Sequence, residues 1–312
     1  MSSQLATRVA YGNALAELGK TNYDIVVLDA DLSKSTNTAT FGKVFPDRHF
    51  NCGIAEQNML GIAAGLAASG KIPFASTFAV FGAGRAFEII RNSICYPKLN
   101  VKIAVTHAGL TVGEDGATHQ SIEDIALMRT LPNMTVLCPA DGVETDKMIK
   151  AIVAYNGPVY IRLGRPNLPI IMNTDYEFQI GKAVQLKEGK DVSIIAMGIM
   201  VAQALLAQEE LEKEGISSRV INMSSIKPID ELAIINAAKE TGAIVTAEEH
   251  SIIGGLGGAV AEVLVKDTYA PVEMVGVQDT FGESGTPQEL LEKYGLTYKE
   301  IVKAAKKCIS RK

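Results

Sequence analysis

The chain has 312 residues, of which 47% are hydrophobic, and a formal net charge of −5; it can bury a large core and has room for about two domains. The mild acidity and the scattered lysines argue against a nucleic-acid-binding surface. Because no apolar run is long enough to cross a bilayer and the four cysteines form no CxxC pair, we expect a cytoplasmic protein without membrane attachment or structural zinc.

The first part of the chain alternates helical and strand patterns. Apolar residues recur at helical spacing over 5–18, and the short apolar runs that follow are typical of buried strands. This alternation predicts a mostly parallel sheet covered by helices on both faces. The expected helices are 5–18, 55–68, 85–92, one from 122, and 143–154, and the expected strands are 25–28, one near 74, 101–105, 135–137 and 159–161.

The pattern lapses over 165–176, where prolines and asparagines in "RPNLPIIMNTDY" favour a connection between domains. The alternation then returns and predicts a smaller α/β domain. We therefore expect an α/β protein with a first domain over 1–172, a linker over 173–185 and a second domain over 186–312. In the second domain the expected strands are 192–196, 219–221, 243–246 and 272–275, and the expected helices are 202–213, 230–239, 259–266 and two at the carboxyl end.

The stretch "HAGLTVGEDGATHQSIEDIA" follows the expected strand 101–105 directly. Open α/β sheets place their ligands beyond the carboxyl ends of strands, so this is a site loop by position. Its glycines let the backbone approach a ligand, and Glu114, Asp115 and His119 supply acid, base and hydrogen-bonding groups. On this stretch alone, a solvated surface loop is an equally good interpretation.

Two earlier segments also carry candidate residues. Glu56 falls in the first turn of a helix of small and apolar residues, where it either complements the helix dipole or serves as a poorly solvated proton donor. Phe78 and Phe81 lie three residues apart after a short strand. They either pack in the core or enclose a flat heteroaromatic ring.

Taken together, these segments resemble the carboxyl-terminal two thirds of transketolase, over nearly the whole chain. The resemblance implies the pyrimidine-binding and carboxyl-terminal domains of that family, which uses thiamine diphosphate and Mg²⁺ to transfer a two-carbon ketol unit from a ketose phosphate to an aldose phosphate. The matching segments are GIAEQN at 53–58, TFAVF at 77–81, THAGLTVGEDGATHQSIED at 106–124, LPNMTVLCPADGVE at 131–144 and RLGRPNLP at 162–169.

In this family, a Gly-Asp-Gly motif followed by an asparagine holds Mg²⁺ and the diphosphate. The sequence contains no such motif. The resemblance therefore implies a split enzyme, in which a separate amino-terminal subunit supplies this site and neither subunit is active alone. It further implies that the chain self-associates to a dimer and forms a heterotetramer with its partner. No metal ligand is assigned to this chain.

The resemblance also implies which residues contact the cofactor. Glu56 matches the acid that protonates the aminopyrimidine ring, and Phe78 and Phe81 match the aromatic residues that enclose it. Asp31 matches a residue at the cofactor-side subunit contact. A third aromatic residue of some transketolases is replaced here by Gly84, which leaves the ring less enclosed.

For the substrate, His119 matches a histidine near the reacting oxygen, and Asp115 matches an aspartate that hydrogen-bonds a substrate hydroxyl. Two arginines, a histidine and a hydroxyl suit a phosphate dianion through charge-assisted hydrogen bonds. The residues matched to substrate-phosphate ligands are His107, Ser35, Arg165 and Arg8.

Three alternatives share parts of this pattern. Deoxyxylulose-phosphate synthase also has the Ala-Glu-Gln run seen at 55–57, and the β subunit of a 2-oxo acid dehydrogenase has the same two domains. A non-catalytic regulatory subunit of the same fold is the third. The GEDGATH segment and the split architecture favour transketolase over the synthase. Phosphate ligands at Arg165 and His107 would have no use with pyruvate, which argues against the dehydrogenase subunit. The polar residues Glu56, His107, Asp115 and His119 argue against the regulatory subunit. The glycine-rich stretch 252–264 departs from a dinucleotide fingerprint in its spacing and is assigned to packing.

Overall fold

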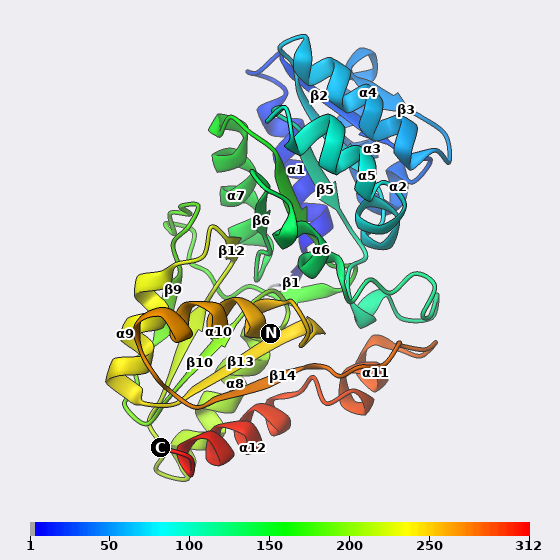
Figure 1. The fold of residues 1–312 in the computed structure, drawn as a ribbon. Helices are drawn as coiled ribbons and strands as arrows, with labels where there is room; N and C mark the ends of the chain where they lie inside the picture. The colour runs from blue at the N-terminus through cyan, green and yellow to red at the C-terminus, as the bar shows by residue number, and fades with distance from the viewer. Residues whose placement is uncertain (1–3) are drawn as a thin grey trace.

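The computed structural model describes residues 4–312 as two α/β units, each built on its own sheet (Figure 1). The first sheet has seven strands in the order β12-β6-β7-β5-β4-β2-β3, and all its pairings are parallel except that of β12 with β6. These strands are β2 (Ile25–Asp29), β3 (His49–Asn51), β4 (Ile72–Ser76), β5 (Lys102–Val105), β6 (Thr135–Leu137), β7 (Val159–Arg162) and β12 (Ser225–Lys227).

Helices cover both faces of this sheet because its central strands are apolar on both sides. In β2, Ile25 and Val27 join the core under α1 and α7, whereas Val26 and Leu28 join the core under α4 and α6. The helices are α1 (Thr7–Leu18), α2 (Ser33–Thr36), α3 (Thr38–Val44), α4 (Glu56–Ala68), α5 (Phe87–Ile89), α6 (Asp124–Thr130) and α7 (Gly142–Ala154), with π-helical turns at Val80–Arg85 and Ile90–Cys95 and 3₁₀ turns at Pro46–Arg48 and Leu110–Val112.

The second sheet has five strands in the order β14-β13-β10-β11-β9, with only β9 antiparallel to its neighbour. The predicted α/β class, with a mostly parallel sheet and a smaller α/β domain after it, is confirmed. The elements of this second α/β unit are β9 (Val184–Lys187), β10 (Val192–Ala196), α8 (Met200–Lys213), β11 (Ser218–Asn222), α9 (Glu231–Thr241), β13 (Ile244–Ser251), α10 (Leu256–Asp267), β14 (Val272–Val277), α11 (Pro287–Lys293) and α12 (Tyr298–Ile309).

Two pairings join segments that are far apart in the sequence. Strand β1 (Gln4–Ala6) pairs with β8 (Asn167–Pro169), and β12 leaves the second half of the chain to pair with β6. The first helix therefore begins at Thr7, not at residue 5, because residues 4–6 are extended beside β8. The region expected to be an irregular connection likewise contains a strand.

Two further expectations need correction. Strand β13 continues to Ser251, five residues beyond its predicted end. The polar side chains near its end, Glu248, Glu249 and His250, are buried. The helix predicted over 85–92 belongs to a longer helical segment from Val80 to Cys95, which contains two π-helical turns. Such turns shift the side chains by part of a turn and occur often at functional sites.

The strand order reverses beside β2, since β3 lies on one side of it and β4 on the other. In open α/β sheets a ligand crevice forms at such a reversal, outside the carboxyl ends of the strands. Three predicted site residues lie two positions after the end of a strand: Asp31 after β2, Phe78 after β4 and His107 after β5. Among residues 4–312, no helix combines the length and the apolar character needed to span a membrane.

Candidate functional site

Four of the predicted site residues form one cluster of rings. The Phe78 and His107 rings stack with centroids 4.0 Å apart, and the Phe78 and Phe81 rings lie 6.1 Å apart and nearly parallel. The His119 ring meets Phe81 edge-on at 5.5 Å. We define the site loop as residues 107–121. The rings that follow the ends of two neighbouring strands and the ring of His119 in this loop thus line one wall.

His107 is held in an unusual backbone conformation. Its φ is +56°, which is uncommon for a residue with a side chain, and its Nδ1 lies 2.9 Å from the hydroxyl of Thr106. Burial lowers the pKa of His107 to about 3, and the positive charges of Arg8 and Arg165 act in the same direction. The imidazole is therefore neutral at neutral pH.

Arg8 connects the residues predicted to bind phosphate. Its Nε donates to the carbonyl oxygen of Arg165 at 3.2 Å, and its Nη1 donates to the carbonyl oxygen of Ser35 at 2.8 Å. The β1–β8 pairing brings Arg8 and Arg165 together across 157 residues. Arg165 also donates to Glu114 of the site loop at 3.0 Å. Burial and the neighbouring Arg165 lower the pKa of Arg8.

Glu56 is the first residue of α4 and only 2% exposed. Its Oε2 lies 2.9 Å from Nη1 of Arg85, whose guanidinium group lies 4.7 Å from the centre of the Phe81 ring. Arg85 thus connects Glu56 to the ring cluster. The sequence pattern did not indicate Arg85 as a site residue, although its position four residues after Phe81 on a helical segment places both side chains on one face.

Two predicted site residues, Asp31 and Asp115, are exposed. Asp31 is exposed beyond the end of β2, with φ at +63°, and its Oδ1 accepts a hydrogen bond from Asn51 at 2.9 Å. Asp115 is exposed on the site loop.

The donor set fits a flat heterocycle better than a metal ion. Aromatic rings, a buried carboxyl group and a guanidinium group converge on one wall, as binding of an aromatic nitrogen base requires. Across residues 4–312, no three His, Cys, Asp or Glu side chains are grouped so as to hold a metal ion.

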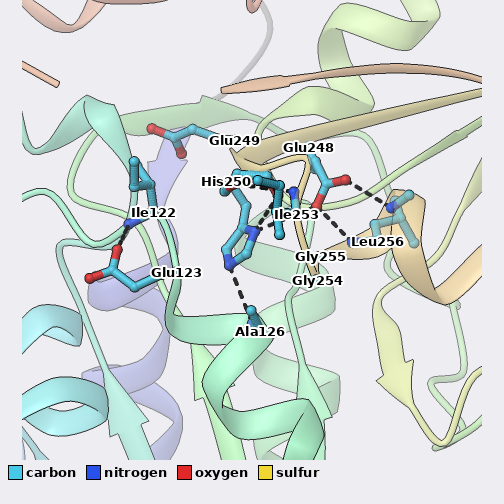
Figure 2. A network of polar contacts seen from close by, with 12 residues as sticks. Ile122, Glu123, Ala126, Glu248, Glu249, His250, Ile253, Gly254, Gly255 and Leu256 are labelled. Atoms are coloured by element: carbon cyan, nitrogen blue, oxygen red, sulfur yellow. Dashed lines mark hydrogen bonds and ion pairs between the residues drawn. The ribbon is translucent and has the colours of Figure 1, made fainter. Parts of the chain in front are cut away.

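A glycine-rich turn precedes α10, and a side chain of the protein itself binds the free amides at the N-terminus of that helix. The carboxylate of Glu248 accepts hydrogen bonds from the amides of Leu256 at 2.6 Å and Gly257 at 2.8 Å (Figure 2). A Cβ at Gly255 would lie 1.9 Å from that carboxylate, so glycine is required there. Because an internal carboxylate binds these amides, the turn serves packing, as the sequence analysis assigned it.

Two family models match the chain in succession. "Transketolase, pyrimidine binding domain" matches residues 3–170, and "Transketolase, C-terminal domain" matches residues 181–301. The chain belongs to the transketolase family. The resemblance seen in the sequence motifs is thereby confirmed.

Two relatives that this chain covers almost completely are described as a split-gene transketolase and as a transketolase subunit. A solved structure described as "Split gene transketolase, inactive beta4 tetramer" is 62% identical, with a TM-score of 0.93 over 98% of this chain and 99% of that one. The 6-deoxy-6-sulfo-D-fructose transketolase subunit SqwH of a Clostridium species is 46% identical over 98% of this chain and 95% of its own length. Human transketolase is 39% identical over the whole chain but extends to twice its length, since only 50% of it is covered. The chain is thus a transketolase carboxyl-terminal subunit.

Proposed function

We propose that this subunit, together with a separate amino-terminal subunit, transfers a two-carbon ketol unit from a ketose phosphate to an aldose phosphate. The observation that carries the proposal is the meeting of two different walls at one reversal of strand order. One wall consists of the rings of Phe78 and Phe81 backed by buried Glu56, and the other consists of the cations Arg8 and Arg165 beside His107.

The first wall suits the aminopyrimidine of thiamine diphosphate. When bound, this cofactor supplies the carbanion-stabilising chemistry of the reaction. Phe78 and Phe81 enclose the ring, and Glu56 holds a proton at the ring nitrogen from a site that water does not reach. Arg85 is half exposed, so it can turn toward solvent when Glu56 engages the ring. Asp31 lies at the contact with the partner, which holds Mg²⁺ and the diphosphate.

The second wall suits a sugar phosphate. Arg8 and Arg165 neutralise the phosphate charge, and Ser35 and His107 donate hydrogen bonds; His107 does so as a neutral ring because burial keeps its pKa near 3. His119 moves protons at substrate hydroxyls, and Asp115 orients a hydroxyl group. Pyruvate has no phosphate, so this wall favours ketol transfer over the 2-oxo acid dehydrogenase reaction.

The assembly we propose is a dimer of this chain that binds two amino-terminal subunits to form a heterotetramer in the cytoplasm. The similar split-gene protein was solved as a tetramer of its β chain alone and is described as inactive, which supports the need for a partner. The proposed domain limits are 1–172, 173–185 and 186–312.

Mixing the purified chain with the product of a partner gene tests this function. Ketol transfer between sugar phosphates should occur only in the mixture and only with thiamine diphosphate and Mg²⁺. Condensation of pyruvate with glyceraldehyde phosphate would instead favour a deoxyxylulose-phosphate synthase. If the mixture forms a stable complex that acts on neither sugar phosphates nor pyruvate, the regulatory alternative is favoured.

A further inference from the structure

We propose that Glu249, in the carboxyl-terminal domain, is a positioning residue for the site loop and acts through the backbone amide of Thr111. This inference rests on the function proposed above, because the loop carries the histidines assigned there to the substrate. It gives the carboxyl-terminal domain a direct part in the site.

The contact between Glu249 and the site loop is short and buried. Glu249 is 4% exposed on β13, and its Oε1 accepts a hydrogen bond from the amide of Thr111 at 2.6 Å, across 138 residues of sequence. Gly109 also lies against this carboxylate, since a Cβ at Gly109 would lie 2.3 Å from the Glu249 carboxyl carbon. The loop backbone therefore rests directly on the Glu249 side chain.

The same end of β13 holds the other end of the loop. Nη2 of Arg162 donates to the carbonyl oxygens of Glu249 at 2.9 Å and Ser121 at 3.2 Å, and the amide of Ser251 donates to the carbonyl oxygen of Ile122 at 2.7 Å. Ile122 and Glu249 are seen on the same side of the polar network in Figure 2. One strand of the second sheet thus fixes the loop near its start and at its end.

The loop has both internal and external contacts. Gly109, Gly113 and Gly116 all adopt positive φ, where glycine is conformationally free, and the amides of Gly113 and Gly116 bind carbonyl oxygens within the loop. The amide of Thr111 instead binds Glu249, which fixes this part of the loop to the carboxyl-terminal domain. Displacing a reacting group by about 1 Å can cost about 100-fold in rate. A single buried acceptor that fixes one amide is therefore enough to affect turnover.

Adjacent Glu248 provides a matched control. Both carboxylates are buried on β13, but neighbouring side chains of a strand point to opposite faces. Figure 2 shows Glu248 directed toward the start of α10, where it binds the amide of Leu256. A change at Glu248 disturbs the carboxyl-terminal domain without touching the loop.

Two variants of Glu249 separate the effect of side-chain length from the effect of its charge. Glu249→Asp keeps the negative charge near Arg162 but is one methylene too short to accept from Thr111. Glu249→Gln loses the charge but keeps a carbonyl oxygen at the same reach. Hydrogen–deuterium exchange of residues 107–121 is measured on the chain alone, and kcat, KM and thiamine diphosphate affinity are measured on the two-subunit enzyme.

We expect Glu249→Asp to speed exchange of the loop amides and to lower kcat by about 10- to 100-fold. Cofactor affinity should change less than kcat, because Glu56 and Phe81 lie on other segments and only the ring contacts of His107 and His119 connect the loop to the cofactor wall. Glu249→Gln should restore both slow exchange and most of kcat. Glu248→Gln should lower the melting temperature while leaving loop exchange and kcat as in the wild type.

The inference is overturned if Glu249→Asp leaves loop exchange and kcat unchanged, or if Glu249→Gln loses slow exchange and kcat as fully as Glu249→Asp, because the glutamine keeps the acceptor for the Thr111 amide. If Glu249→Asp does not fold, Gly109→Ala disturbs the same contact from the loop side and should give the same loss of kcat. Absence of ketol transfer by the wild-type assembly would defeat the proposed function, whereas the exchange data would still decide whether Glu249 holds the loop.

Discussion

The ring of His107 lies against the ring of Phe78, with centroids 4.0 Å apart and an angle of 25° between the planes. The pair forms because β4 and β5 are adjacent and parallel, and their register continues as a bridge between Phe78 and Thr106. One stacked pair therefore joins the wall proposed for the cofactor to the wall proposed for the phosphate. A change to either ring is expected to affect both.

Replacement of His107 by glutamine should reduce the sensitivity of the fold to acid. The folded-state pKa of about 3 lies below the usual 6.5, so as pH falls below 6.5 the unfolded chain takes up a proton that the folded chain refuses. At pH 5 this costs the wild type about 2 kcal/mol of folding free energy. The test is urea unfolding at pH 7.5 and 5.0. Identical losses in the two proteins would contradict the buried, neutral state of His107.

Glu56→Gln should leave assembly intact but lower turnover by about 100-fold or more, since it removes the acid from the ring nitrogen. Sedimentation reports the assembly and single-turnover kinetics report the chemistry. Glu88→Gln is the control, because Glu88 is an exposed carboxylate on the neighbouring α5 that accepts from Asn92. Full turnover by the Glu56 variant would remove this residue from the mechanism.

Arg165→Ala should raise KM for phosphorylated sugars by about 10- to 100-fold with a smaller change in kcat, as expected for lost ground-state binding. A non-phosphorylated acceptor such as glycolaldehyde should show no such change. The exposed Arg91, which binds Asn92, supplies a control substitution to alanine. Equal effects on both kinds of acceptor would argue against a phosphate role.

The sequence predicted the sheet and the site for a common reason. Strands buried on both faces are continuous apolar runs, and the residues directly after them must lie at the same edge of a parallel sheet. His107 was found this way. Phe78 was singled out by its spacing from Phe81 and by the family resemblance, and the structure brings it into contact with His107. Arg85 was missed because a single arginine in a helical pattern looks like a solvated residue.

The end of β13 could not be predicted from local pattern. "EEHS" at 248–251 is typical of an exposed loop, yet Glu248, Glu249 and His250 are buried. Their partners lie on α10, the site loop and α6, up to 138 residues away. The three-residue strand β1 was missed for the same reason, because it exists only through its distant partner β8.

Lys102 should make the fold more stable as pH rises from 7 to about 10. It is fully buried at the start of β5, where its Nζ donates to the carbonyl oxygens of Tyr155 at 2.7 Å and Gly157 at 2.9 Å. Burial lowers its pKa to about 7 from 10.5, so the folded chain releases this proton first and the unfolded chain holds more protons in between. Stability therefore rises with pH across that window.

Lys102→Met removes the titrating group, so the variant should lack this rise, which amounts to about 2–3 kcal/mol between pH 7 and 9 in the wild type. It should be less stable at pH 9, since two buried carbonyl groups lose their donor. Lys98→Met, at a nearby exposed position, is the control and should keep the wild-type slope. Urea unfolding at both pH values measures the difference, and parallel slopes for Lys102→Met and the wild type would show that Lys102 remains charged when buried.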